Sequence, residues 1–118
     1  MNQAHLTVSQ HITDDGVRVL ALAGEIDHTT TAILRQALDP EDGRALDIVI
    51  DFHDVTFMDS SGINILVAAN NAARASGSRL SLARMPESIS DLLHIVGLDD
   101  VIALYPTLDE ALEAKHAA

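Results

Sequence analysis

The sequence predicts a single α/β domain built on a mixed sheet of four to five strands with about four helices. Three observations support this prediction: the 118-residue length suits one domain, apolar residues make up 47% of the chain, and strand patterns alternate with helical patterns. The expected order is β-β-α-β-α-β-α-β-α, over one domain spanning residues 1–118 with its core at about residues 6–115. Alternation of this kind implies parallel strands joined by crossovers, and a hairpin at the start adds an antiparallel pair.

Two strand patterns open the chain. Residues 6–12 alternate apolar and polar side chains, and residues 17–23 form a more apolar run. Between them, Asp14-Asp15-Gly16 is a turn signal, because glycine tolerates the positive φ that tight hairpin turns need. Gly24-Glu25-Ile26-Asp27 is expected to close the second strand.

A short helix and a covered strand are expected next. Asp27 or one of Thr29 to Thr31 is expected to cap a helix through Leu38, and Pro40-Glu41-Asp42-Gly43 is expected to end it. The inward stripe of this helix is predicted to be Ile33, Leu34, Ala37 and Leu38. Residues 46–52 are rich in β-branched side chains, which predicts a buried central strand followed by a short loop.

The second helix is expected to begin at a polar turn, Asp59-Ser60-Ser61-Gly62, and to run to about Ala75, where Ser76-Gly77-Ser78 stops it. Its spacing predicts an inward face of Ile65, Leu66, Ala69 and Ala73. The outward face is predicted to be Asn64, Val67, Asn71 and Arg74.

A strand and a third helix are predicted after that stop. Leu80 and Leu82 mark the strand, and Met85-Pro86 breaks it. The helix is predicted from apolar residues at helical spacing, with Gly97 as its stop. These residues are Ile89, Leu92, Leu93 and Val96.

The chain is expected to close with a strand and a fourth helix. The strand is predicted over Val101 to Tyr105 and ends at Pro106. Thr107 and Glu110 have the capping-box spacing, which predicts the start of a helix. Its inward residues are predicted to be Leu108, Ala111, Leu112 and Lys115.

Charge and composition exclude several functions. Lys plus Arg number 7 and Asp plus Glu number 18, so the net charge is −11, which argues against nucleic acid and against anionic lipid as partners. The chain has no cysteine, so thiolate metal sites and Cys nucleophiles are excluded. The apolar runs are far shorter than the ~20 residues that span a bilayer, and the first residues do not resemble a secretory signal. We therefore expect a cytoplasmic protein without membrane contact.

The turn at Asp59-Ser60-Ser61-Gly62 is the main candidate site, because open α/β sheets place their sites at the carboxyl ends of strands. Helix capping is the alternative interpretation, and it accounts for one of the three polar side chains. Residues 60–86 contain no acid, so the outward face of the second helix is nearly uncharged. Such a face suits a protein interface, although Asn and Ala on an exposed helix give the same pattern.

Three segments resemble the STAS domain, and more closely the bacterial anti-sigma factor antagonists: Gly24-Glu25-Ile26-Asp27, residues 57–62, and Val96-Gly97-Leu98. The resemblance implies that the unphosphorylated protein binds an anti-sigma factor of the serine kinase type and frees the sigma factor. It also implies that phosphorylation of Ser60 blocks binding and that a serine phosphatase resets it, with no cofactor and no metal. The implied partner-binding residues are Glu25, Asp27, Asp59, Ser61, Gly62, Ile63, Asn64, Val67 and Asn71. Asn64 departs from the family, which usually has glycine there, and this puts partner identity in question.

Other functions are possible within and outside this resemblance. An enzyme is not expected, because Ser60 lies in no Gly-x-Ser-x-Gly elbow. His28 beside Asp27, and His53 with Asp51 and Asp54, are better interpreted as solvated loop charges than as a general base or a metal site. The alternative functions are a STAS subunit of a stress-signalling assembly or of a lipid-transport ATPase complex, or a sensor of small ligands.

Overall fold

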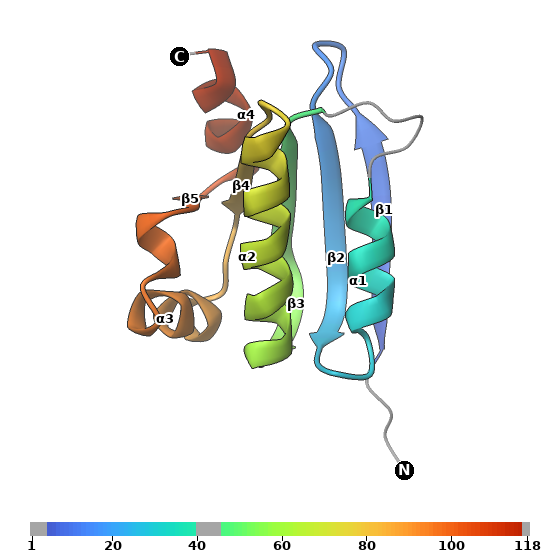
Figure 1. Ribbon diagram of the computed structural model, residues 1–118, viewed down its shortest axis with the longest axis vertical. Coiled ribbons are helices and arrows are strands. Elements are labelled where there is room, and N and C mark those ends of the chain that lie inside the picture. The colour runs from blue at the N-terminus through green and yellow to red at the C-terminus, as the bar shows by residue number, and fades with distance from the viewer. Residues whose placement is uncertain (1–4, 40–45, 117–118) are drawn as a thin grey trace.

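The computed structural model describes residues 5–39 and 46–116 as a five-stranded sheet with helices on both faces (Figure 1). The strands lie in the order in which they occur in the chain, and the list is β1 (Leu6–Ile12), β2 (Arg18–Ile26), β3 (Ile48–Met58), β4 (Leu80–Ala83) and β5 (Ala103–Tyr105). The strand β1 is antiparallel to β2, and every later neighbour is parallel. The mixed sheet and the element order are therefore confirmed.

The helices are divided unequally between the two faces of the sheet. They are α1 (Thr31–Leu38), α2 (Ser60–Ala75), α3 (Glu87–Ile95), the 3₁₀ helix η2 (Leu98–Asp100) and α4 (Leu108–His116). In Figure 1, α1 and α2 run side by side across the near face, with α1 over β1 and β2 and α2 over β3. The helix α4 packs on the opposite face through Ala111, which lies in a cluster with Val19 and Val49.

The main core lies between the sheet and the helices α1, α2 and α3. Its fully buried members come from successive elements and include Leu20, Ile50, Leu34, Leu66 and Leu93. Each of these side chains removes apolar surface from water and stabilises the fold by about 1.5–3 kcal/mol. Aromatic residues contribute little, since only Phe52 among them is fully buried. The core is thus built from aliphatic side chains, as the 3% aromatic content requires.

Most helix termini lie where the capping residues predict. The side chain of Thr107 accepts a hydrogen bond from the backbone N–H of Glu110 at 3.0 Å, which confirms the predicted cap of α4. Thr30 occupies the N-cap position of α1, but its side chain makes no cap hydrogen bond. The turn predicted at 40–43 lies outside the described residues, as does the side chain of Lys115.

Four expectations are corrected by the structure. The strand β3 continues to Met58 instead of ending at Phe52, because β2 extends alongside it to Ile26 and pairs with it across register shifts. The last strand begins at Ala103, since residues 98–100 form the 3₁₀ helix η2.

Ile33 and Val96 account for the other two corrections, because both are exposed. Neighbouring helical positions differ by about 100°, so Ile33 turns outward once Leu34 occupies the centre of the inward face. Val96 lies beyond the end of α3, where helical spacing no longer sets the direction of a side chain. Within residues 5–39 and 46–116, no helix is long and apolar enough to cross a membrane.

Candidate partner-binding site

The turn between β3 and α2 is held by Asp59. Asp59 is the N-cap of α2, and its carboxylate accepts a hydrogen bond from the backbone N–H of Ser61 at 2.8 Å. This contact satisfies one of the N–H groups that a helix start leaves without a partner. Ser60 is the first residue of α2 and is exposed. The capping interpretation therefore accounts for Asp59 and leaves the Ser60 hydroxyl presented to solvent.

Gly62 fixes how closely α2 approaches the sheet. A Cβ atom at this position would lie 2.6 Å from Cγ of Met58 and 2.8 Å from Cγ2 of Ile26, which is closer than carbon atoms pack. Gly62 is itself buried. Gly62 therefore allows the first turn of α2 to pack closely on the ends of β2 and β3. Its neighbours in the turn form the surface of the site.

The loop after β2 lies beside this turn. Ile26 pairs with Met58 across the sheet, and the backbone N–H of Asp59 donates to the carbonyl of Ile26 at 3.1 Å. Because β2 and β3 are parallel, Asp27 and Asp59 follow neighbouring strands at the same edge of the sheet. The two segments that contain Asp27 and Asp59 are therefore neighbours in the structure.

Hydrogen bonds from Thr29, in the loop after β2, stabilise the ionised carboxylate of Asp27. The hydroxyl of Thr29 donates to Oδ1 of Asp27 at 2.6 Å, and the backbone N–H of Thr29 donates at 2.8 Å. These hydrogen bonds keep the pKa of Asp27 below its ordinary value. Thr30 fixes the same loop from its buried side. Its hydroxyl donates to the carbonyl of Glu25 and accepts from the N–H of Asp27.

An exposed row of side chains continues from the turn along α2. Ser60, Asn64, Val67 and Asn71 are spaced four, three and four residues apart and are all exposed, so they form one outward stripe, which we call the outer α2 stripe. The inward positions Ile65, Leu66 and Ala73 are buried, as predicted. From Ser60 to Asn71 the stripe contains no charged side chain and includes an apolar residue, Val67, that is 40% exposed; Arg74, the fourth residue of the predicted outward face, is exposed one turn further along. It therefore has the low charge that is typical of the centre of a protein interface.

The other predicted site residues lie between these features. Glu25, Ser61 and Ile63 are half-buried near the turn, and Ile63 also packs against the core. Sequence reasoning missed two residues here. Thr30 holds the neighbouring loop, and Phe57 lies opposite Glu25 in the sheet register and is 48% exposed. Strand alternation was the available signal for Phe57, since its neighbour Met58 points into the core.

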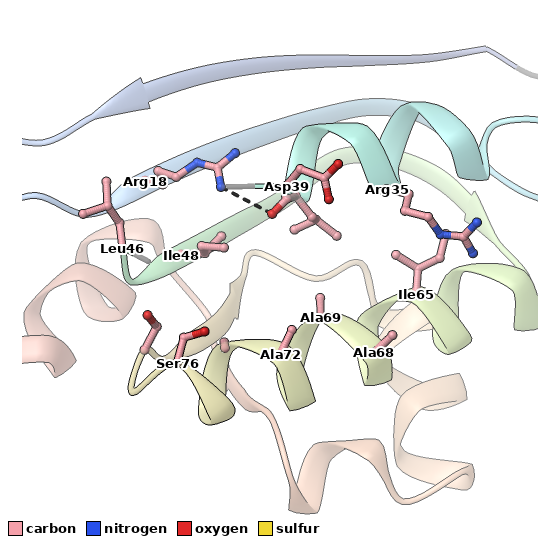
Figure 2. A pocket seen from close by; sticks show the side chains of 13 residues that line it. Arg18, Arg35, Asp39, Leu46, Ile48, Ile65, Ala68, Ala69, Ala72 and Ser76 are labelled. Atoms are coloured by element: carbon pink, nitrogen blue, oxygen red, sulfur yellow. Dashed lines mark hydrogen bonds between the residues drawn. The ribbon is translucent and has the colours of Figure 1, made fainter. Parts of the chain in front are cut away.

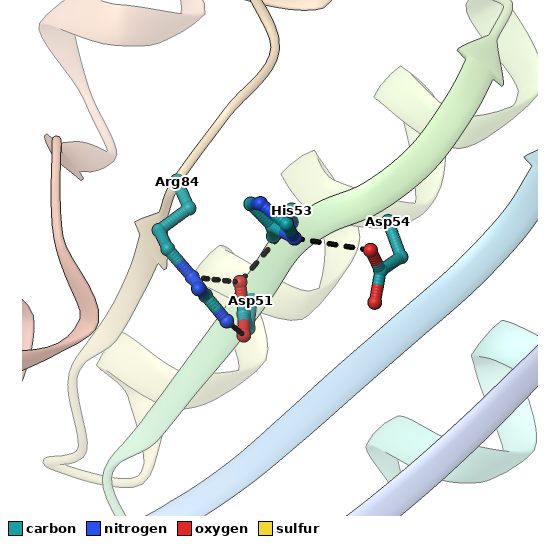
Figure 3. A network of polar contacts seen from close by, with 4 residues as sticks. All are labelled: Asp51, His53, Asp54 and Arg84. Atoms are coloured by element: carbon teal, nitrogen blue, oxygen red, sulfur yellow. Dashed lines mark hydrogen bonds and ion pairs between the residues drawn. The ribbon is translucent and has the colours of Figure 1, made fainter.

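A second polar cluster lies further back along β3 (Figure 3). Arg84, just after β4, donates to both carboxylate oxygens of Asp51, at 3.0 Å from Nε and 2.5 Å from Nη2. Burial raises the pKa of Asp51, but the hydrogen bonds from Arg84 and from the N–H of His53 outweigh it and leave the pKa below its ordinary value. His53 contacts Asp54 at 3.0 Å, and both of these side chains are exposed. Among the described residues, no group of three His, Cys, Asp or Glu side chains is placed to hold a metal ion.

The fold and the turn together define a class of protein. It is a small α/β domain that presents a hydroxyl at a helix N-terminus, beside an uncharged helix face that suits contact with another protein. The chain belongs to the STAS domain family, which matches residues 10–111.

Several relatives and a solved structure are similar over nearly the whole chain. The anti-sigma-B factor antagonist of Bacillus subtilis is 33% identical over 98 residues, covering 83% of this chain and 87% of the relative. The anti-sigma-F factor antagonist RsfB of Mycobacterium tuberculosis is 34% identical over 113 residues, covering 91% and 85%. A crystal structure of an anti-sigma factor antagonist from Mycobacterium paratuberculosis superposes with a TM-score of 0.79 at 34% identity and covers 93% of each chain.

Proposed function

We propose that this protein is an anti-sigma factor antagonist that acts in the cytoplasm by binding an anti-sigma factor of the serine kinase type and thereby releasing a sigma factor. Phosphorylation of Ser60 by that kinase blocks the binding, and a serine phosphatase restores it. The observation that carries the proposal is the exposed Ser60 at the first position of α2, in the turn that resembles the phosphorylated turn of these antagonists. The names of the relatives support the same function.

The docking surface consists of the turn, the loop after β2 and the outer α2 stripe. Hydrogen bonds on both sides hold the backbone of this surface, with Asp59 capping α2 and Thr30 fixing the loop. A surface held in this way loses little conformational freedom when a partner binds. Val67 supplies an apolar contact at its centre, and Asn64 and Asn71 supply hydrogen-bonding groups beside it.

A phosphate on Ser60 weakens binding of the partner and does not unfold the domain. It adds about −1.5 to −2 charge at neutral pH, and the dipole at the N-terminus of α2 tolerates that charge. The same charge lies beside the carboxylate of Asp59 and close to the loop of ionised Asp27. Burying it under a partner without a matching cation is costly, and switching binding from 99% to 1% needs a difference of about 5.5 kcal/mol between the two forms.

The test compares baits that differ at Ser60 and at its neighbour. Ser60→Ala is expected to capture the anti-sigma factor and to resist phosphorylation by it, whereas Ser60→Asp is expected to capture far less. Ser61→Ala is the matched control, because it removes a hydroxyl from the same helical turn and is expected to be phosphorylated like wild type. Labelling of Ser60→Ala by the kinase at the wild-type level would contradict the assignment, and so would equal capture by both Ser60 baits.

A further inference from the structure

A cavity of about 280 Å³ lies between α1 and α2, above the sheet (Figure 2), and Ser60 is not among the described residues that line it. Its lining runs along α2 from Ile65 to Ser76, which corresponds to a length of about 16 Å. Its volume is close to the lower end of the 300–1,000 Å³ that small-molecule sites occupy. The cavity opens to solvent along one rim, where Ala68, Ala72 and Ser76 are exposed, and its floor is formed by buried residues such as Ile48 and Ile65.

Small side chains on α2 create the cavity. Four of its lining residues are alanines of α2: Ala69 and Ala73 on the inward face, and the exposed Ala68 and Ala72 at the rim. Leu38 and Ile48 line the opposite side, and Figure 2 shows the labelled alanines projecting from α2 toward the strands. The walls are thus mainly apolar and fit an unbranched hydrocarbon chain.

A buried guanidinium supplies the polar end. Arg18 on β2 is only 3% exposed and lines the cavity. Its Nε and Nη2 donate to the side-chain oxygen of Gln10, Nη2 also donates to the carbonyl of Ala37, and Nη1 reaches the carbonyl of Leu38 at 3.4 Å. A guanidinium has five N–H groups, so contacts with residues 5–39 and 46–116 leave one N–H on Nη1 without an acceptor.

The charge of Arg18 has no ionic partner in the described part of the chain. Each of its acceptors is a neutral oxygen, and no carboxylate of residues 5–39 and 46–116 lies at ion-pair distance from it. A buried charge is stabilised most by an opposite charge that it can also hydrogen-bond. Among the described residues of the lining, the other charged side chains are Arg35 and Asp39, so these three side chains together carry a net positive charge.

We propose that this cavity binds a small amphiphilic carboxylate, with its carboxylate on Nη1 of Arg18 and its unbranched apolar chain along the alanines of α2. The site is separate from the Ser60 surface and does not depend on the function proposed above. The occupant is a free monocarboxylate and not a nucleotide, because the volume is small and the walls are mainly apolar.

The experiment titrates the full-length protein with octanoate and follows backbone amide shifts by NMR. Saturable shifts are expected at residues that line the cavity, with a Kd on the order of 1 mM or tighter. Octan-1-ol has the same chain without the charge, and it is expected to bind about tenfold more weakly, the typical loss for a hydrogen bond to a charged group. An absence of saturable shifts with octanoate, or equal affinity for the two probes, would overturn the proposal.

Two variants localise the site. Ala72→Leu fills the cavity from its exposed rim and is expected to weaken octanoate binding at least tenfold, whereas Ala75→Leu adds the same side chain to α2 outside the lining and is expected to bind like wild type. Arg18→Gln is expected to bind octanoate and octan-1-ol equally. If Arg18→Gln fails to fold, the two alanine variants still decide the matter, since equal binding by both would refute this location.

Discussion

Two carboxylates of the β3 segment illustrate two different ways of holding an acid. Asp59 follows β3 and bonds to the N–H of Ser61, two residues away. Asp51 lies within β3, is 5% exposed and pairs with Arg84, which is 33 residues away. The first contact is local and needs only the first turn of α2 to form. The second exists only after β3 and β4 have paired.

The two carboxylates therefore have different roles: one orients a surface turn, and the other stabilises the sheet. The cap of Asp59 orients a surface turn that stays accessible to a partner, so its loss is expected to affect docking more than stability. The pair links the buried carboxylate of Asp51 on β3 to Arg84, just after β4, so its loss is expected to affect stability. Arg84 even adopts a positive φ of 55°, a region that side chains with a Cβ rarely occupy.

The largest stability effect is therefore expected for Arg84→Ala. It leaves the buried carboxylate of Asp51 without its cation, and the free energy of unfolding is expected to fall by about 3 kcal/mol. Asp51→Ala is expected to cost less, because Arg84 is 40% exposed and can be rehydrated. Urea denaturation of the two single variants and the double variant measures the coupling, and additive effects would refute the pairing.

Gly62→Ala tests a long-range packing contact of the turn. The added Cβ collides with the side chains of Met58 and Ile26, which costs about 1–3 kcal/mol, partly offset by the better helix propensity of alanine. A net loss of roughly 1–2 kcal/mol in the same denaturation experiment is expected. Ser60→Ala at the exposed position of the same helical turn serves as control and is expected to leave stability nearly unchanged.

Asp59→Ala is expected to have a smaller effect, about 1 kcal/mol, because it removes a single helix cap. Asp59→Asn keeps an acceptor for the N–H of Ser61 and is expected to lose only a few tenths of that amount. Thermal unfolding monitored by circular dichroism distinguishes these outcomes. A loss for Asp59→Ala as large as that of Arg84→Ala would remove the contrast between local and long-range contacts.

The smallest expected effect is the pH dependence of the contribution that Asp51 makes to the free energy of unfolding. Its folded pKa lies below the ordinary value of 3.8, so the ionised pair contributes its full stability above that pH. The contribution is lost as the pH falls through the folded pKa. The difference in unfolding free energy between wild type and Asp51→Asn is therefore expected to be constant above about pH 5 and to shrink below pH 4. A difference that grows on acidification would contradict the assigned direction.

The same contrast explains what could be predicted from the sequence. The cap at Thr107, the start of α2 at residues 59–62 and the inward face of α2 depend on neighbours within a few residues, and they were predicted. The Asp51 pair and the extension of β3 to Met58 depend on partners far along the chain.

The cavity could not be predicted for a similar reason. Of the four lining alanines, Ala69 and Ala73 could be identified by helical spacing, but the gap beside them depends on how closely α1 approaches. Arg18 occurs within an apolar run, and its hydrogen bonds to the carbonyls at the end of α1 and to the side chain of Gln10 explain why it is buried there.

The most direct measurement of the central claim is the affinity of the purified anti-sigma factor for this protein before and after phosphorylation at Ser60, determined by isothermal titration calorimetry. Thermal unfolding of both forms is recorded alongside. The account predicts a large loss of affinity, up to about 10⁴-fold, with little change in the unfolding temperature. Unchanged affinity, or a loss that is matched by unfolding of the domain, would contradict it.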